Sequence, residues 1–157
     1  MDRPIEERGP DVLAPPPLIY LGPLLAGLAL DRFLPLPRQP AALRSSAGPT
    51  LLASGIGLGL WFLASMRRAA TPFDPSQPPT ALVEDGPFRF SRNPGYLGFA
   101  LTYTGISLLA GGRWPLVFLP AVLGVIDRGV IAREEAYLQE RFGLPYRDYR
   151  SRVRRWL

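Results

Sequence analysis

Two polar clusters carry the side chains best suited to chemistry in this sequence. The first is Arg92-Asn93-Pro94-Gly95-Tyr96, and the second is the pair Glu134-Glu135. Together they offer a guanidinium, a carboxamide, a phenol and two carboxylates. A guanidinium binds a carboxylate or phosphate through charge-assisted hydrogen bonds, and carboxylates accept from ammonium and hydroxyl groups. Such a set suits a polar, charged cofactor, provided that the fold brings both clusters to one place.

The chain contains neither Cys nor His among its 157 residues. This excludes Ser/His/Asp and Cys/His nucleophilic sites, because the base that would activate the nucleophile is missing. It also leaves carboxylates as the only common metal ligands, so we expect no metal site. All 18 basic residues are Arg and the net charge is +5. They gather at the ends of apolar segments, which favours contact with a membrane surface over nucleic acid.

Four apolar segments must position the two clusters, at residues 18–36, 45–66, 93–112 and 114–132. Each is long enough to cross a bilayer as a tilted helix. The second is the clearest, because it carries no charge and is closed by Arg67-Arg68. A cleaved signal peptide is a weaker interpretation of the first, because acidic residues outnumber basic ones before it. We therefore expect an all-α integral membrane protein with about four transmembrane helices.

The segment Gly55-Ile56-Gly57-Leu58-Gly59 lies inside the second apolar run. Its glycines resemble a dinucleotide-binding loop, but no strand precedes them. Close packing against another helix through Gly55 and Gly59 is the better interpretation.

The remaining segments complete a single membrane domain. Residues 1–17 end in Pro15-Pro16-Pro17 and predict a flexible tail, residues 18–66 form a first helical hairpin, and the proline-rich stretch 67–92 forms a loop. Residues 93–157 form a second hairpin and a charged tail. In that tail Tyr146, Tyr149 and Val153 share one helical face, which favours a short helix on the membrane surface.

The Arg residues also predict the orientation. The loop before the second hairpin and the C-terminal tail hold most of them, whereas the other two connections hold few. Positive charge accumulates on the cytoplasmic side, so we expect both termini and both polar clusters to face the cytoplasm, in a bacterial inner membrane. The second hairpin returns the chain to the same side, so the Arg92–Tyr96 cluster and the Glu134-Glu135 pair should become neighbours.

Two motifs in the second half resemble those of the isoprenylcysteine carboxyl methyltransferase and phospholipid methyltransferase family. The stretch Gly86-Pro87-Phe88-Arg89-Phe90-Ser91-Arg92-Asn93-Pro94-Gly95-Tyr96-Leu97-Gly98 is similar to the pattern G-P-[YF]-R-x-x-R-H-P-x-Y-x-G. The tail, from Glu134-Glu135 through Phe142-Gly143, Tyr146 and Tyr149 to Val153-Arg154-Arg155-Trp156, is similar to E-E-x-x-L-x-x-x-F-G-x-x-Y-x-x-Y-x-x-x-V-x-R. The order and the two-helix spacing between the motifs also agree.

The resemblance implies S-adenosylmethionine as cofactor and a lipophilic or small methyl acceptor, such as a carboxylate, amine or thiol. Arg92 and Glu135 would act in catalysis. The residues expected to bind the cofactor are Arg92, Asn93, Pro94, Tyr96, Leu97, Glu134, Glu135 and Tyr146. Arg92 would pair with the carboxylate, the two Glu would accept from the ammonium and ribose hydroxyls, and adenine would lie against Tyr96 or Tyr146.

One departure from the family pattern concerns Asn93, which stands where the family usually has His. A carboxamide replaces a neutral imidazole as a hydrogen-bond partner, but it cannot act as a base. Two other interpretations therefore stay open: a non-enzymatic membrane protein that retains the fold, and a reductase-like protein that binds a nicotinamide cofactor. For single residues, Arg92 could anchor to lipid phosphate, and Glu134 and Glu135 could be solvated and paired with Arg128 or Arg141. Tyr146, Tyr149 and Trp156 could be interface anchors, and Asp127-Arg128 could be a structural pair or line a pocket.

Overall fold

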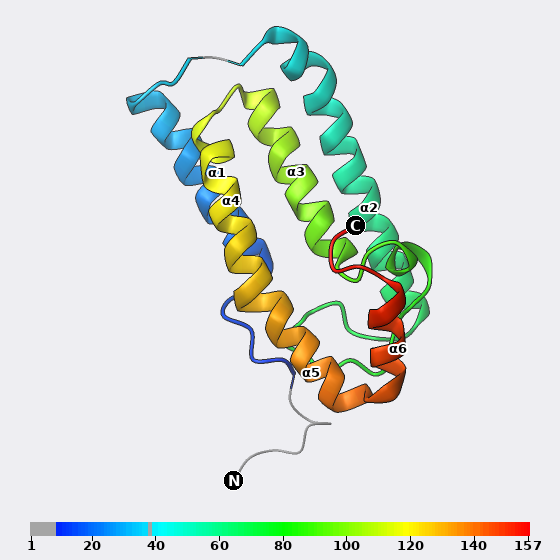
Figure 1. Cartoon of the computed structure of the whole chain (residues 1–157). Coiled ribbons are helices and arrows are strands. Elements are labelled where there is room, and N and C mark those ends of the chain that lie inside the picture. Colours follow the sequence, from blue (N-terminus) through cyan, green and yellow to red (C-terminus); the bar gives the residue numbers. More distant parts are fainter. Residues whose placement is uncertain (1–8, 38) are drawn as a thin grey trace.

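Four long helices, aligned side by side, build this protein in the computed structural model (Figure 1). The structure describes residues 9–37 and 39–157. The helices are α1 (Pro16–Phe33), α2 (Gly48–Arg68), α3 (Pro94–Ala110) and α4 (Trp114–Ile126). No strand occurs among the described residues, which confirms the all-helical class.

Short helical turns extend two of these helices. The π-helical turn η1 (Leu43–Ala47) leads directly into α2, and a second such turn, η3 (Asp127–Ile131), joins α4 to α5 (Ala132–Phe142). The chain then turns at Gly143, whose φ is +58°, into α6 (Leu144–Arg152). The 3-10 turn η2 (Gly86–Arg89) lies in the loop before α3. Figure 1 shows α5, α6 and this loop gathered at one end of the bundle.

The ends of α3 follow from local sequence. Pro94 occupies the first turn, where its fixed φ suits a helix and its missing N–H leaves no bond unmade. Gly111 ends the helix in the left-handed region, with φ +73°, and its N–H donates to the carbonyl of Leu108. The chain can therefore reverse within a few residues and begin α4 at Trp114.

The helices α2 and α3 approach closely through glycine. A Cβ atom at Gly55 would lie 2.6 Å from the amide nitrogen of Thr102 and 2.7 Å from the carbonyl oxygen of Gly98. A Cβ atom at Gly98 would in turn lie 3.3 Å from the amide nitrogen of Gly59. These contacts are with backbone atoms, so only glycine allows this approach. The predicted packing role is confirmed for Gly55, whereas a Cβ atom at Gly59 would meet open space, so close packing does not require glycine there.

Membrane crossing is supported most directly for two helical stretches. Leu43–Arg68 and Trp114–Phe142 are long and apolar enough to span a bilayer. By comparison, α1 has 18 residues and α3 has 17, which corresponds to a helix of about 26 Å at ~1.5 Å per residue, against a hydrocarbon core of ~30 Å. The structure thus agrees with a membrane protein, and the four-span topology stays a prediction.

The N-terminal segment follows the bundle from Gly9 onward, where a flexible tail was expected for residues 1–17. Helix α1 already begins at Pro16. Before it, the amide of Leu13 donates to the carbonyl of Gly129 at 3.2 Å, and Arg133 Nη1 donates to the carbonyl of Asp11 at 2.9 Å. Gly129 lies in the π-helical turn η3, where the ordinary helical hydrogen-bond pattern is interrupted. Residues 1–8 lie outside the described part of the chain.

Candidate functional site

The two polar clusters predicted from the sequence meet at the end of the bundle formed by α3, α5 and α6. Helix α3 begins there with Pro94, directly after Arg92 and Asn93. Glu134 and Glu135 lie in the first turn of α5, which continues α4 back from the opposite end. The neighbourhood expected from the hairpin is therefore present.

Glu135 is the centre of a buried ion-pair cluster. Its Oε1 accepts from Arg92 Nη2 at 2.7 Å, and its Oε2 accepts from Arg155 Nη2 at 2.6 Å. The side chains of Glu135 and Arg92 are only 8% and 9% exposed. Away from water the attraction between two charges is less screened, although their desolvation offsets it, and loss of one partner leaves an uncompensated buried charge. Glu135 is thus not a solvated surface residue.

Glu134 makes a different contact from its neighbour. Its Oε1 accepts from the hydroxyl of Tyr96 at 2.9 Å, and the carbonyl of Tyr96 accepts from the hydroxyl of Tyr20 at 3.0 Å. This chain of bonds joins α5 to α3 and α3 to α1. The carboxylate of Glu134 keeps further acceptor capacity, since each oxygen has two lone pairs.

Asn93 is buried before the first turn of α3. Its amide Nδ2 donates to the carbonyl of Arg155 at 2.9 Å, and its backbone N–H donates to Ser91 Oγ at 3.1 Å. Pro94 is fully buried and provides helix geometry; as an apolar ring it offers no polar contact. In this structure the side chain of Asn93 holds the C-terminal segment.

Tyr146 and Tyr149 point into the protein, at 1% and 3% exposure, so the interpretation as membrane-interface anchors is wrong for both. Burial raises the pKa of Tyr146 to about 12, and the negative charge of Glu135 adds to the effect. The phenol therefore stays protonated at neutral pH. Tyr149 donates from its hydroxyl to the carbonyl of Phe88 at 2.8 Å, which attaches α6 to the loop before α3.

Three residues outside the predicted set complete the cluster: Asp127, Arg155 and Trp156. Asp127 Oδ2 accepts from Arg155 Nη1 at 3.0 Å, and Asp127 Oδ1 accepts from the indole Nε1 of Trp156 at 3.1 Å. The hydrogen bond to Glu135 raises the pKa of Arg155, so the guanidinium stays charged. The sequence contains a signal for two of these residues. Asp127 is a charged residue inside an apolar span, and Arg155 is the final Arg of the tail motif.

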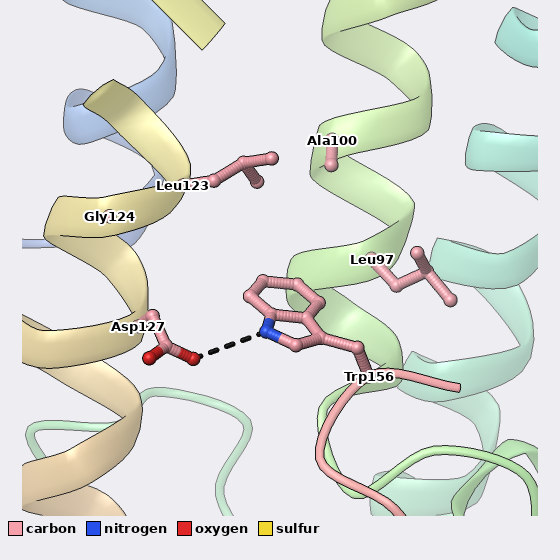
Figure 2. Close-up of a pocket in the computed structure, with 6 residues that line it drawn as sticks. All are labelled: Leu97, Ala100, Leu123, Gly124, Asp127 and Trp156. Atoms are coloured by element: carbon pink, nitrogen blue, oxygen red, sulfur yellow. Dashed lines mark hydrogen bonds between the residues drawn. The ribbon is translucent and has the colours of Figure 1, made fainter. Parts of the chain in front are cut away.

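A mostly apolar pocket of about 380 Å³ opens between α3 and α4 beside this cluster (Figure 2). Its walls are Leu97, Ala100, Leu123 and Gly124, with Asp127 and Trp156 at one end. Leu97 thus lines the pocket and is not part of the neighbouring ion-pair cluster. Asp127 lines the pocket, as one interpretation of Asp127-Arg128 held, and its ion pair is with Arg155 of the tail.

The cluster can bind a charged polar molecule in several ways. It holds two guanidiniums and three carboxyl groups, and Arg92 Nε is buried with no hydrogen-bond partner among the described residues. Within the same described part of the chain, no three His, Cys, Asp or Glu side chains are placed so that they could hold one metal ion. The arrangement can therefore bind carboxylate, ammonium and hydroxyl groups by hydrogen bonding next to an apolar cavity.

Comparison with known proteins gives a family match and two partial relatives. The family model for phospholipid methyltransferase matches residues 43–144, which is 102 of 157 residues. A protein-S-isoprenylcysteine O-methyltransferase of Schizosaccharomyces pombe is 36% identical over 72 residues, or 46% of this chain and 30% of that protein. An uncharacterised protein of Haemophilus influenzae is 39% identical over 62 residues, 40% of this chain and 98% of its own length.

No solved structure matches this chain. The matched region covers less than a third of the S. pombe relative, so it corresponds to a part of that protein. The family match, by contrast, extends from η1 to the start of α6 and contains Arg92, Glu134 and Glu135. The chain therefore belongs to the phospholipid methyltransferase family.

Proposed function

We propose that this protein is an integral membrane methyltransferase that uses S-adenosylmethionine and a lipophilic or small acceptor at the cytoplasmic face. The observation that carries the proposal is the convergence of Arg92, Glu134 and Glu135 beside an apolar pocket, within the region matched by the family model. These residues come from two distant motifs. Their contact at one end of the bundle is what a shared ligand requires.

The residues present fit the cofactor chemically. Arg92 has an unused buried donor at Nε, which suits a carboxylate, and Glu134 has acceptor capacity for an ammonium or hydroxyl group. Tyr96 bonds to Glu134, the phenol of Tyr146 feels the charges of Glu135 and Arg92, and both rings are suited to lie beside adenine. When bound, S-adenosylmethionine supplies an electrophilic methyl group on a sulfonium.

The chain's own contribution is binding, orientation and exclusion of water. The guanidinium of Arg92 and the carboxylate of Glu135 are held in place by each other, so little reorganisation is needed on binding. The apolar walls around Leu97 and Leu123 would offer an acceptor bound in the pocket an apolar surface in place of water. Positioning of two reactants in line supplies much of the acceleration of a displacement reaction, and none of these roles needs His or Cys.

A calorimetric titration of the detergent-purified protein with S-adenosylmethionine and with its demethylated product tests this function. We expect micromolar binding of both, and at least about a tenfold loss of affinity in Glu134→Ala, because a hydrogen bond to a charged group is lost. The matched control is Glu140→Ala, an exposed residue of the same helix, which should bind as the wild type does. A folded protein that binds neither compound refutes the proposal.

A second candidate, a non-enzymatic membrane protein of the same fold, is favoured by one observation. Both oxygens of Glu135 and both oxygens of Asp127 already have partners inside the protein. Carboxylates whose oxygens all have partners inside the protein can serve stability alone. The same titration separates the candidates, and a parallel titration with a reduced nicotinamide dinucleotide covers the reductase-like alternative.

A further inference from the structure

The last five residues, Val153–Leu157, follow α6 and fold back onto the start of α3; we refer to them as the C-terminal strap. Figure 1 shows this segment returning to the lower end of α3. The loop before α3 donates two hydrogen bonds to backbone carbonyls of the strap. The amide of Arg92 donates to the carbonyl of Arg154 at 3.0 Å, and Ser91 Oγ donates to the carbonyl of Arg155 at 3.3 Å.

The strap carries two side chains of the site. Arg155 lies between Glu135 and Asp127 and bonds to both. Trp156 extends its indole between α3 and α4, donates to Asp127 and forms part of the pocket wall (Figure 2). The position of the strap therefore decides where one guanidinium of the ion-pair cluster lies and how the pocket is closed.

Asn93 provides the shortest of the side-chain hydrogen bonds to the strap backbone. Its Nδ2 donates to the carbonyl of Arg155 at 2.9 Å, from a residue that is 9% exposed. This hydrogen bond needs only a donor at position 93, and no proton is transferred in it. An imidazole N–H at this position could donate in the same way, whereas an ionised Asp offers only acceptors to a carbonyl oxygen. A buried carbonyl that loses its donor is destabilised.

We propose that Asn93 is a positioning residue: through the carbonyl of Arg155 its carboxamide holds the C-terminal strap, and with it Arg155 and Trp156, in the geometry of the site. The effect on cofactor binding rests on the function proposed above, but the effect on the strap does not. In this role, the replacement of the family His by Asn keeps the one property that matters, a hydrogen-bond donor.

The strap is measured directly by fluorine NMR of the 5-fluorotryptophan-labelled protein. The chain has three Trp residues, and the Trp156→Phe variant assigns the signal of Trp156. We expect Asn93→Asp to shift or broaden this signal and leave those of Trp61 and Trp114 in place. Asn93→His should restore the wild-type signal. If Asn93→Asp disturbs all three signals, the nearly isosteric Asn93→Leu, which lacks both donor and charge, replaces it.

Binding of S-adenosylmethionine by the same variants separates a positioning role from direct contact. We expect about a tenfold loss of affinity in Asn93→Asp, near wild-type affinity in Asn93→His, and no further loss when Asn93→Asp is added to Arg155→Ala. Ser151→Ala, an exposed position of α6, is the control and should match the wild type in both measurements.

Two results would overturn the proposal: an unchanged Trp156 signal in the variants of Asn93 that lack a donor, or full additivity of Asn93→Asp and Arg155→Ala. The second result would mean that Asn93 contacts the cofactor itself. If the wild type does not bind S-adenosylmethionine, the proposed function fails, but the fluorine signal still decides whether Asn93 holds the strap.

Discussion

At the scale of single residues, Glu135 connects the two family motifs. It bonds to Arg92 of the first motif, Gly86–Gly98, and to Arg155 at the end of the tail motif. Arg155 in turn bonds to Asp127. Four charged groups thus form one network at the end of the bundle. Arg92 and Glu135 are buried and share the network with the half-buried Arg155 and Asp127, so the removal of one member should affect the others.

Replacement of Glu135 by Ala should therefore destabilise the protein strongly. The change leaves Arg92, which is 9% exposed, beside Arg155 without the carboxylate that both share. Removal of one partner from a buried pair costs about 3 kcal/mol or more. The free energy of unfolding, measured by denaturant titration in detergent, checks this expectation.

The exposed pair between Glu84 and Arg152 is the matched control, since their side chains are 35% and 63% exposed. Glu84→Ala should lower the free energy of unfolding by less than about 1 kcal/mol, because water screens the pair. Equal losses for Glu84→Ala and Glu135→Ala would contradict the central role given to Glu135.

At the scale of elements, the contact between α2 and α3 fixes the start of α3, and with it the motif Gly86–Gly98, against the rest of the bundle. Helix α3 begins at the site, and Gly55 and Gly98 allow α2 to lie directly against it. The tight approach follows from the absence of side chains at these positions. A wider spacing would displace the start of α3, and with it Asn93 and Tyr96.

Gly55→Ala should force the two helices apart. Its Cβ atom would lie 2.6 Å from a backbone nitrogen of Thr102, which cannot move without moving α3. Overpacking of this kind costs about 1–3 kcal/mol. Unfolding by denaturant should show the loss for Gly55→Ala and none for Gly57→Ala, where a Cβ atom meets open space and Ala favours the helix. Equal stability of the two variants would speak against close packing at Gly55.

At the scale of the whole molecule, the distribution of Arg and the four aligned helices favour one arrangement in the membrane. The end with α5, α6 and the loop 69–93 carries most of the Arg side chains, and the opposite end carries few. The predicted four spans would place the site and both termini on the same side of the membrane.

Single cysteines can report this topology, because the natural chain has none. An impermeant maleimide added to intact bacterial spheroplasts should label Ala41→Cys but not Gln77→Cys or Ser151→Cys, all three of which replace exposed residues. Inverted vesicles should show the opposite pattern. Labelling of Ala41→Cys and Gln77→Cys from the same side would exclude a crossing of the membrane by α2.

The sequence by itself determined the helical class, most helix ends, the packing glycine and the two motifs. These features depend on local properties, such as hydropathy, Pro at a first turn and Gly at a reversal. It also predicted that the Arg92–Tyr96 segment and the Glu134-Glu135 pair are neighbours, because a hairpin returns the chain to its starting side.

Only the tertiary structure decided which side chains touch. The pairing of Arg92 with Glu135, the burial of Tyr146 and the return of Arg155 and Trp156 to Asp127 depend on the directions of two loops and the strap. No short-range pattern encodes those directions. They result from the burial of charges and aromatic rings contributed by segments far apart in the chain, where one arrangement satisfies most hydrogen bonds at once.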